Sequence, residues 1–313
     1  MGVFDDIQAG LGKGFDAAMD AAGKGFDAAA SATNKALVTR APFIQAFIHL
    51  CDDGWLQDWH ERNGGNLTYR MTEEDVAKVR GGFDSAPREW VDLGFSEPTL
   101  ANAYFLITGS GAYMHNVSAS PIENIGIVEM NEAGSAYRVV WGLVNRKPTS
   151  ELPTHIMNHA IRMKATDGAC RVIYHAHPNN IIAMTFVEPL DARTFSRALW
   201  KAMTECVVVF PEGVGVVPWM VPGGNEIAKA TSEQMKSYPA VIWAQHGLFV
   251  SGADFDETFG LMHCIEKAAD IYFRARTMNG GSNEFLNTIT DEGLAQIGVE
   301  FNVEINKEFL DVQ

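Results

Sequence analysis

Two histidines that stand one residue apart give the sequence its clearest chemical signal. His175 and His177 follow the mostly β-prone residues 171–174 and precede Pro178. Side chains i and i+2 of a strand point to the same face, so we expect both imidazoles side by side at a strand end. Such a pair is half of a zinc site, because zinc takes three or four N, O or S ligands. Two ordinary polar histidines near a strand end would show the same spacing, so the assignment depends on further ligands.

A third histidine has the right setting to complete such a site. His246 ends a predicted buried strand over residues 240–246 and is followed by Gly247. An imidazole at a strand end, distant in the sequence, is the natural partner of a His-x-His pair. His155 and His159 also have metal-pair spacing, four residues apart on a predicted helix. We expect these two to pack or to form hydrogen bonds instead.

Two glycine turns are candidate anion sites. Asn63 and Asn66 flank two glycines between a predicted helix and a short strand, and Gly109-Ser110-Gly111 follows the predicted strand 104–108. Glycines let backbone N–H groups approach an anion, although Asn-Gly is also common turn chemistry. The second turn lacks the lysine and the spacing of a nucleotide-binding loop, so we predict neither ATP nor NAD there.

Two glutamates stand where elements begin. Glu151 falls in the first turn of a helix that Thr149 or Ser150 is expected to cap. It is either a helix-start acid or a carboxylate beside an anion held by those hydroxyls and the free N–H groups. Glu205 precedes a predicted buried strand over residues 207–210.

Hydrophobic and turn patterns predict the elements that hold these residues. Helices are expected over residues 42–60, 72–80, 181–187, 192–203, 223–236, 255–277 and 290–299, with another beginning near Pro148. Besides the strands already named, one is expected over residues 67–71, and residues 125–130 and 136–144 form a predicted hairpin.

The composition narrows the class of protein. The chain has 313 residues, is 47% hydrophobic and carries a net charge of −15. An acidic surface argues against nucleic acid or an anionic membrane as a partner, but not against a small anionic substrate. Four scattered cysteines, Cys51, Cys170, Cys206 and Cys264, suggest free thiols in a reducing compartment. Without an apolar run of membrane length or a secretory signal, we expect a cytoplasmic protein.

Residues 1–38 contain an internal repeat. Residues 12–22 and 23–33 are near copies, GKGFDAAMDAA and GKGFDAAASAT, and phenylalanine recurs every 11 residues. Eleven residues are close to three helical turns, but glycines at about 1 kcal/mol each would leave such a helix marginal. We predict an amphipathic helical or disordered extension that binds a shell or assembly partner, which could place the protein in a protein-shelled compartment. A disordered or engineered tail is the alternative.

The remaining motifs follow one order along residues 41–300. They include WHERNGGNLT (residues 59–68), ITGSG (107–111), PTSELPTH (148–155), HAHPNN (175–180), TECVVVFPEGVGVVPWMVPG (204–223), QHGLF (245–249) and DETFGL (256–261). In these stretches the chain resembles the class II zinc aldolases of the aldolase/adducin family, and residues 1–38 lie outside the resemblance.

The resemblance implies an α/β fold for residues 39–313, a single domain with a central, mainly antiparallel β-sheet flanked by helices. It implies cleavage of a phosphorylated sugar by a homotetramer with active sites between subunits. His175, His177 and His246 would hold Zn²⁺, Glu151 would be the catalytic acid/base, and Glu205 would be an acid contributed by the neighbouring subunit. The positions that match those holding the substrate phosphate are Asn63, Ser110, Gly111, Thr149 and Ser150.

Alternatives remain within and beyond this family. A fuculose-phosphate aldolase or a pentulose-phosphate epimerase would keep similar metal residues. An adducin-like interaction module would keep the fold and lose the metal, but the intact His175, His177, His246 and Glu151 argue against it.

Overall fold

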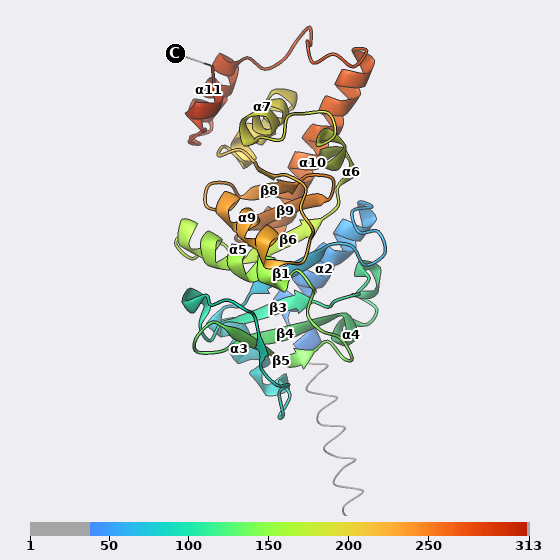
Figure 1. Ribbon diagram of the computed structural model, residues 1–313, viewed down its shortest axis with the longest axis vertical. Coiled ribbons are helices and arrows are strands. Elements are labelled where there is room, and N and C mark those ends of the chain that lie inside the picture. Colours follow the sequence, from blue (N-terminus) through green and yellow to red (C-terminus); the bar gives the residue numbers. More distant parts are fainter. Residues whose placement is uncertain (1–37, 312–313) are drawn as a thin grey trace, which may run out of the picture.

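One sheet of nine strands organises residues 38–311, which are the residues that the computed structural model describes (Figure 1). The strand order is β2-β5-β4-β3-β1-β6-β9-β8-β7. Only β7 and β8 pair in parallel, and every other neighbouring pair is antiparallel. The predicted mainly antiparallel sheet is therefore confirmed. Its strands are β1 (Asn66–Arg70), β2 (Val91–Asp92), β3 (Tyr104–Thr108), β4 (Ile125–Met130), β5 (Ala136–Gly142), β6 (Val172–Ala176), β7 (Gly215–Val217), β8 (Ala240–Trp243) and β9 (Gly247–Gly252).

Helices cover both faces of the sheet (Figure 1). They are α2 (Pro42–Leu56), α3 (Glu73–Val79), α4 (Pro121–Asn124), α5 (Leu152–Ala165), α6 (Asn179–Met184), α7 (Ala192–Ala202), α8 (Glu205–Val209), α9 (Asn225–Gln234), α10 (Phe255–Met278) and α11 (Asp291–Glu300). Helices α5 and α9 pack together, and α10 packs on α2, α6 and α7.

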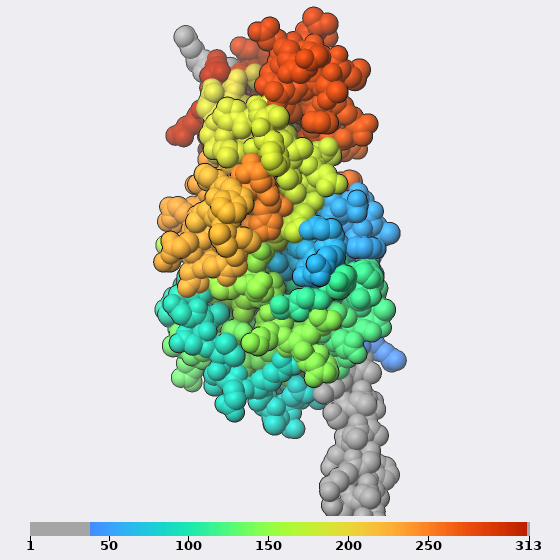
Figure 2. Space-filling view, turned by 45° about the vertical axis from the view of Figure 1, so that its right-hand side comes forward, coloured from blue at the N-terminus to red at the C-terminus, as the bar shows by residue number. Residues whose placement is uncertain are grey.

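The central strand β6 shows why the sequence there is an apolar run. Tyr174 belongs to the core formed with α2 and α10, while Ile173 packs with Ile227 of α9. Because alternate side chains enter two different cores, all five residues of β6 are buried. The molecule is elongated in the views of Figures 1 and 2, and C-terminal segments lie at the end opposite β3–β5.

Three local predictions are wrong. Residues 207–209 of the expected strand 207–210 belong to helix α8, which buries Cys206 and Val207 and packs on α7, α10 and α11. Tertiary packing therefore overrides β propensity there. Neither Thr149 nor Ser150 caps α5, because Glu151 is the N-cap residue and makes no side-chain cap bond. The strand expected to reach His246 ends at Trp243, and a turn with Gln245 at φ 54° carries the histidine.

The other predicted elements are present within a few residues, although the first predicted helix is shorter, ending at Leu56 instead of residue 60. Strands β2, β7 and β9 and the short helix α4 were not predicted. All four cysteines are free thiols, as expected. No helix among residues 38–311 is both long and apolar enough to cross a membrane. The predicted extension lies outside the described residues except for Val38, which is buried in the core.

Candidate metal centre and active site

Three histidines meet at one end of β6. His175 is the fourth residue of β6, His177 follows the strand, and His246 lies in the turn between β8 and β9. One potential ligand atom from each lies within 4.8 Å of the others. The Nε2 atoms of His175 and His177 are 3.2 Å apart. The structure thus brings together the three residues that the sequence predicted as metal ligands.

The second ring nitrogens of the pair are occupied, as zinc chemistry leads one to expect. His175 Nδ1 lies 3.1 Å from the Leu248 carbonyl oxygen, and His177 Nδ1 lies 2.7 Å from Glu61 Oε1. Both partners accept, so both Nδ1 atoms carry hydrogen and both Nε2 lone pairs face the shared space. Burial lowers the pKa of His175 well below its usual value and that of His246 to about 4, which keeps these imidazoles neutral.

This donor set fits a tetrahedral metal ion. Zinc–nitrogen bonds of about 2.0–2.1 Å at tetrahedral angles place two ligand nitrogens about 3.3 Å apart. The 3.2 Å between the two Nε2 atoms agrees with that spacing. Two facing lone pairs without an ion between them would repel, so the pair is arranged to hold a cation. Three imidazoles suit zinc and other nitrogen-preferring divalent metals better than magnesium or calcium.

A buried carboxylate stands beside this group. Glu151 is 7% exposed, and its Oε2 lies 3.7 Å from His175 Nε2. The same oxygen accepts a 2.8 Å hydrogen bond from Asn66 Nδ2. Burial raises the pKa of Glu151 to about 7, against the opposite effect of the Asn66 bond. A carboxyl group in this position is suited to proton transfer next to a metal-bound substrate.

The predicted phosphate residues lie on three neighbouring segments. Ser110 N donates to the Lys147 carbonyl over 2.8 Å, which brings the Ser110-Gly111 turn against the segment that carries Thr149 and Ser150. The turn with Asn63 lies beside the metal group, since a Cβ at Gly64 would be 2.9 Å from His177 Nδ1.

Their exposure differs along these segments. Asn63, Ser110, Gly111 and Ser150 are exposed, whereas Thr149 is buried and accepts from Glu151 N over 3.3 Å. Of the two hydroxyls on this segment that are predicted to bind phosphate, that of Ser150 is therefore more accessible than that of Thr149.

Sequence reasoning missed two residues at this site, Arg146 and Glu61. Arg146 Nη1 donates to the Ser110 carbonyl over 3.3 Å and lies 3.5 Å from where a Gly111 Cβ would be, so a cation borders the predicted phosphate residues. Arg146 stands three residues before Thr149, and a cation so near to predicted phosphate residues could have indicated its role. Glu61, which holds His177, stands within the WHERNGGNLT stretch but has no telling spacing from the histidines.

Glu205 stands apart from the group in this chain. It is exposed on α8, whose packing partners are α7, α10 and α11. None of the three histidines belongs to these helices.

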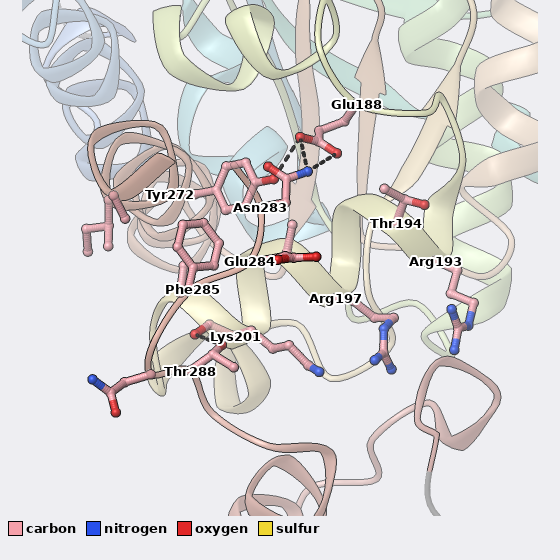
Figure 3. Close-up of a pocket in the computed structure, with 15 residues that line it drawn as sticks. Glu188, Arg193, Thr194, Arg197, Lys201, Tyr272, Asn283, Glu284, Phe285 and Thr288 are labelled. Atoms are coloured by element: carbon pink, nitrogen blue, oxygen red, sulfur yellow. Dashed lines mark hydrogen bonds between the residues drawn. The ribbon is translucent and has the colours of Figure 1, made fainter. Parts of the chain in front are cut away.

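A cavity of about 580 Å³ lies elsewhere, between α7, α10 and residues 283–288 (Figure 3). Four of the five charged side chains that line it are already paired, those of Glu188, Arg193, Arg197 and Lys201. Glu188 Oε1 accepts from Tyr272 Oη and from Arg276 Nη1, at 2.7 and 2.6 Å, and Arg197 Nη1 lies 2.7 Å from Asp291 Oδ2. Because it contains none of the predicted site residues, this cavity is not the candidate active site.

Comparisons with known proteins agree with this arrangement. The family model described as Class II Aldolase and Adducin N-terminal domain matches residues 45–273. Rhamnulose-1-phosphate aldolase of Shigella sonnei is 45% identical over 267 residues, which is 85% of this chain and 96% of that protein. Its counterpart in Enterobacter sp. (strain 638) is 44% identical over 276 residues, covering 88% and 98%.

Solved structures show the same fold. The sugar-phosphate aldolase of Thermotoga maritima superposes with a TM-score of 0.63 at 27% identity, covering 76% of this chain and 95% of that one. An L-fuculose 1-phosphate aldolase gives a TM-score of 0.54 at 22% identity, covering 84% and 97%.

Proposed function

The chain belongs to the class II aldolase and adducin family, and we propose that this aldolase cleaves L-rhamnulose 1-phosphate to dihydroxyacetone phosphate and L-lactaldehyde with Zn²⁺ held by His175, His177 and His246. One observation carries the proposal. Three histidine nitrogens converge beside the buried Glu151, in a chain 45% identical to a rhamnulose-1-phosphate aldolase over 96% of that protein.

The reaction makes separate demands on the residues. The C4 hydroxyl loses its proton, the C3–C4 bond breaks, and its electron pair passes to C3 and the C2 oxygen until C3 takes a proton. A bound zinc ion would supply Lewis acidity for the negative charge that develops on the dihydroxyacetone phosphate half. Glu151, beside His175, is the group we assign to the proton at C3.

The phosphate is assigned to Asn63, Ser110, Gly111, Thr149 and Ser150. Backbone N–H groups and hydroxyls on two adjoining turns suit a phosphate ester, and the Arg146 guanidinium next to Ser110 adds positive charge. Holding the phosphate places C3 near Glu151, and such positioning is a large part of the rate that an enzyme of this kind can gain.

The metal-dependent cleavage has a direct test. Dihydroxyacetone phosphate release from L-rhamnulose 1-phosphate is measured with L-fuculose 1-phosphate alongside, before and after chelation and zinc return. We expect release from the rhamnulose ester that is lost on chelation and restored by zinc. His177→Gln should abolish it, whereas His49→Gln, which changes a histidine with a 74% exposed side chain, should not.

The other outcomes separate the alternatives. Release from the fuculose ester alone would keep the metal chemistry and change the substrate. No release from either ester, with zinc bound, would refute the aldolase proposal.

We also propose that the enzyme is a homotetramer in which Glu205 of one subunit serves the C4 oxygen at the site of the next. Its exposed position on α8 leaves it accessible to a neighbouring subunit. If so, Glu151→Gln and Glu205→Gln subunits, dissociated and mixed, should regain about a quarter of wild-type activity, since one site in four would combine both intact residues. No recovery from mixing would contradict shared sites.

The domain division at residue 38, the cytoplasmic location and the shell or assembly partner remain proposals. Removing residues 1–37 should leave cleavage unchanged and abolish partner binding. Equal partner binding by both forms would refute the role of the extension.

A further inference from the structure

A chain of buried polar groups runs from Glu151 into the space between α5 and β1. Glu151, His155 and His159 follow each other at intervals of four residues on one side of α5, and Asn66 and Thr68 stand on one face of β1. His155, His159 and Thr68 have no exposed surface, and Asn66 is 6% exposed.

The contacts along this chain are continuous. Asn66 Nδ2 donates to Glu151 Oε2 over 2.8 Å, and Asn66 Oδ1 meets His155 Nε2 in a short contact. Thr68 Oγ1 lies 2.7 Å from His155 Nδ1 and 2.8 Å from His159 Nε2. Four successive hydrogen bonds therefore connect Glu151 with a histidine two helical turns away from it.

While Glu151 is ionised, only one assignment of donors and acceptors satisfies this series of hydrogen bonds. A carboxylate only accepts, so the Asn66 amide nitrogen faces Glu151 and the amide oxygen faces His155. His155 Nε2 must then donate. Burial lowers the pKa of His155 to about 3, so the ring is neutral and its Nδ1 accepts from the Thr68 hydroxyl. The Thr68 oxygen in turn accepts from His159 Nε2. Every donor therefore points toward Glu151.

His159, the last residue of this hydrogen-bond series, favours the same assignment of donors and acceptors. Among the described residues, His159 Nδ1 is buried and has no hydrogen-bond partner. In the arrangement above this atom is a bare lone pair. In the reverse arrangement it would carry a buried N–H without an acceptor, and orphaned buried N–H groups are rarer in proteins than under-satisfied acceptors.

We propose that Thr68, His155 and His159 are positioning residues, which fix the Asn66 amide with its N–H toward Glu151 and thereby hold that carboxylate beside His175. Their catalytic consequence rests on the proposed function, in which Glu151 moves the proton at C3. No hydrogen bond or direct ring contact joins any of the three to His175, His177 or His246, and their hydrogen bonds reach these histidines through Asn66 and Glu151. All four hydrogen bonds between Glu151 and His159 Nε2 are made, and buried hydrogen bonds of this kind rigidify the groups that they join.

The test removes one hydroxyl without changing shape. Thr68→Val leaves His155 and His159 without their common partner, while Thr68→Ser keeps the hydroxyl. We expect kcat for sugar-phosphate cleavage to fall roughly tenfold to hundredfold in Thr68→Val, because small misplacements of catalytic groups cost that much. KM and zinc content should stay within about twofold, and Thr68→Ser should restore most of kcat. A folded, zinc-loaded Thr68→Val enzyme with kcat within twofold of wild type would overturn the proposal.

A second pair of variants covers the case in which Thr68→Val fails to fold. His159→Gln places an amide nitrogen near the former Nε2 and should keep the donor to Thr68, whereas His159→Leu removes it. We expect His159→Leu to lower kcat and His159→Gln to recover it. Equal kcat values in the two variants would refute a positioning role for His159.

Neutron diffraction on the deuterated wild-type enzyme shows which ring nitrogens carry deuterium, and it needs no activity assay. Deuterium is expected on Nε2 of both His155 and His159 and on neither Nδ1. Deuterium on Nδ1 of His155 would mean that the donors point away from Glu151, and it would overturn the proposal. If the wild-type enzyme cleaves no sugar phosphate, the proposed function fails, and the neutron result still decides how Asn66 faces Glu151.

Discussion

Replacing Gly247 with alanine should displace two of the candidate metal ligands, His175 and His177. A Cβ at this position would lie 2.5 Å from the Ala176 carbonyl oxygen and 2.9 Å from ring carbons of both His175 and His177. Ordinary contact begins at 3.4 Å, so the Ala176 carbonyl of β6 must move about 0.9 Å from the start of β9, and the two rings must move about 0.5 Å. Metal–ligand distances tolerate only about 0.2 Å. We therefore expect zinc affinity to fall on the order of tenfold to hundredfold, with about 1–3 kcal/mol lost from the free energy of unfolding.

Gly260→Ala is the matched control. Gly260 lies within α10, and a Cβ there would meet nothing within 4 Å. The same change should there raise the free energy of unfolding by up to about 1 kcal/mol and leave zinc affinity unchanged. Competition with a chromogenic chelator gives the zinc affinity of both variants, and denaturant unfolding gives their stability. A Gly247→Ala enzyme that binds zinc as tightly as wild type would refute the close packing of Gly247 against the two histidines.

Three further changes test other parts of the structure. Glu151→Gln should lower kcat for cleavage by about 10²–10⁴ while the zinc content stays unchanged, and a loss below tenfold would contradict its assignment to proton transfer. Burial lowers the pKa of His60 to about 3, so the stability from its neutral form is complete above pH 6.5 and is lost as the pH falls toward 3. Between pH 7 and 5, the free energy of unfolding of the metal-free wild type should therefore fall by about 2 kcal/mol more than that of His60→Gln, and equal losses would refute a neutral buried His60. Asp291→Ala removes the partner of Arg197 and Lys201, at 2.7 and 2.5 Å, and should cost about 2 kcal/mol of stability in denaturant unfolding without changing kcat; unchanged stability would show that these ion pairs contribute nothing measurable.

Six of the nine strands were predictable because they are apolar runs bounded by glycine and polar residues, whereas β2, β7 and β9 were not located. The β4–β5 hairpin and β3 were located on these patterns alone. Helix α8 was not, because a five-residue stretch rich in valine has the composition of a strand. Its helical form depends on packing against α7, which directly precedes it, and against α10 and α11, which are distant in the sequence.

The candidate metal histidines were predictable because a His-x-His spacing puts two imidazoles on one face of a strand and His246 follows another buried strand. The groups that hold these imidazoles were not predictable. His177 depends on Glu61, which precedes it by 116 positions, and His175 depends on a backbone carbonyl, which leaves no trace in the residue types. His246 was expected at a strand end and instead lies in a turn, yet its imidazole reaches the same place. A side chain's chemistry is thus easier to predict than the backbone that carries it.

Asn66 shows why the sequence alone could not connect the carboxylate to the metal group. It looked like part of an anion-binding turn, but it is the first residue of β1 and pairs directly with His175 of β6. Directly paired residues of antiparallel strands put their side chains on the same face of the sheet. A slip of one residue between β1 and β6 would send Asn66 and Thr68 to the opposite face, away from both Glu151 and His155. The register of this one strand pair therefore sets the metal ligand, the carboxylate and the buried chain behind it in a single arrangement, and no local pattern in the sequence specifies that register.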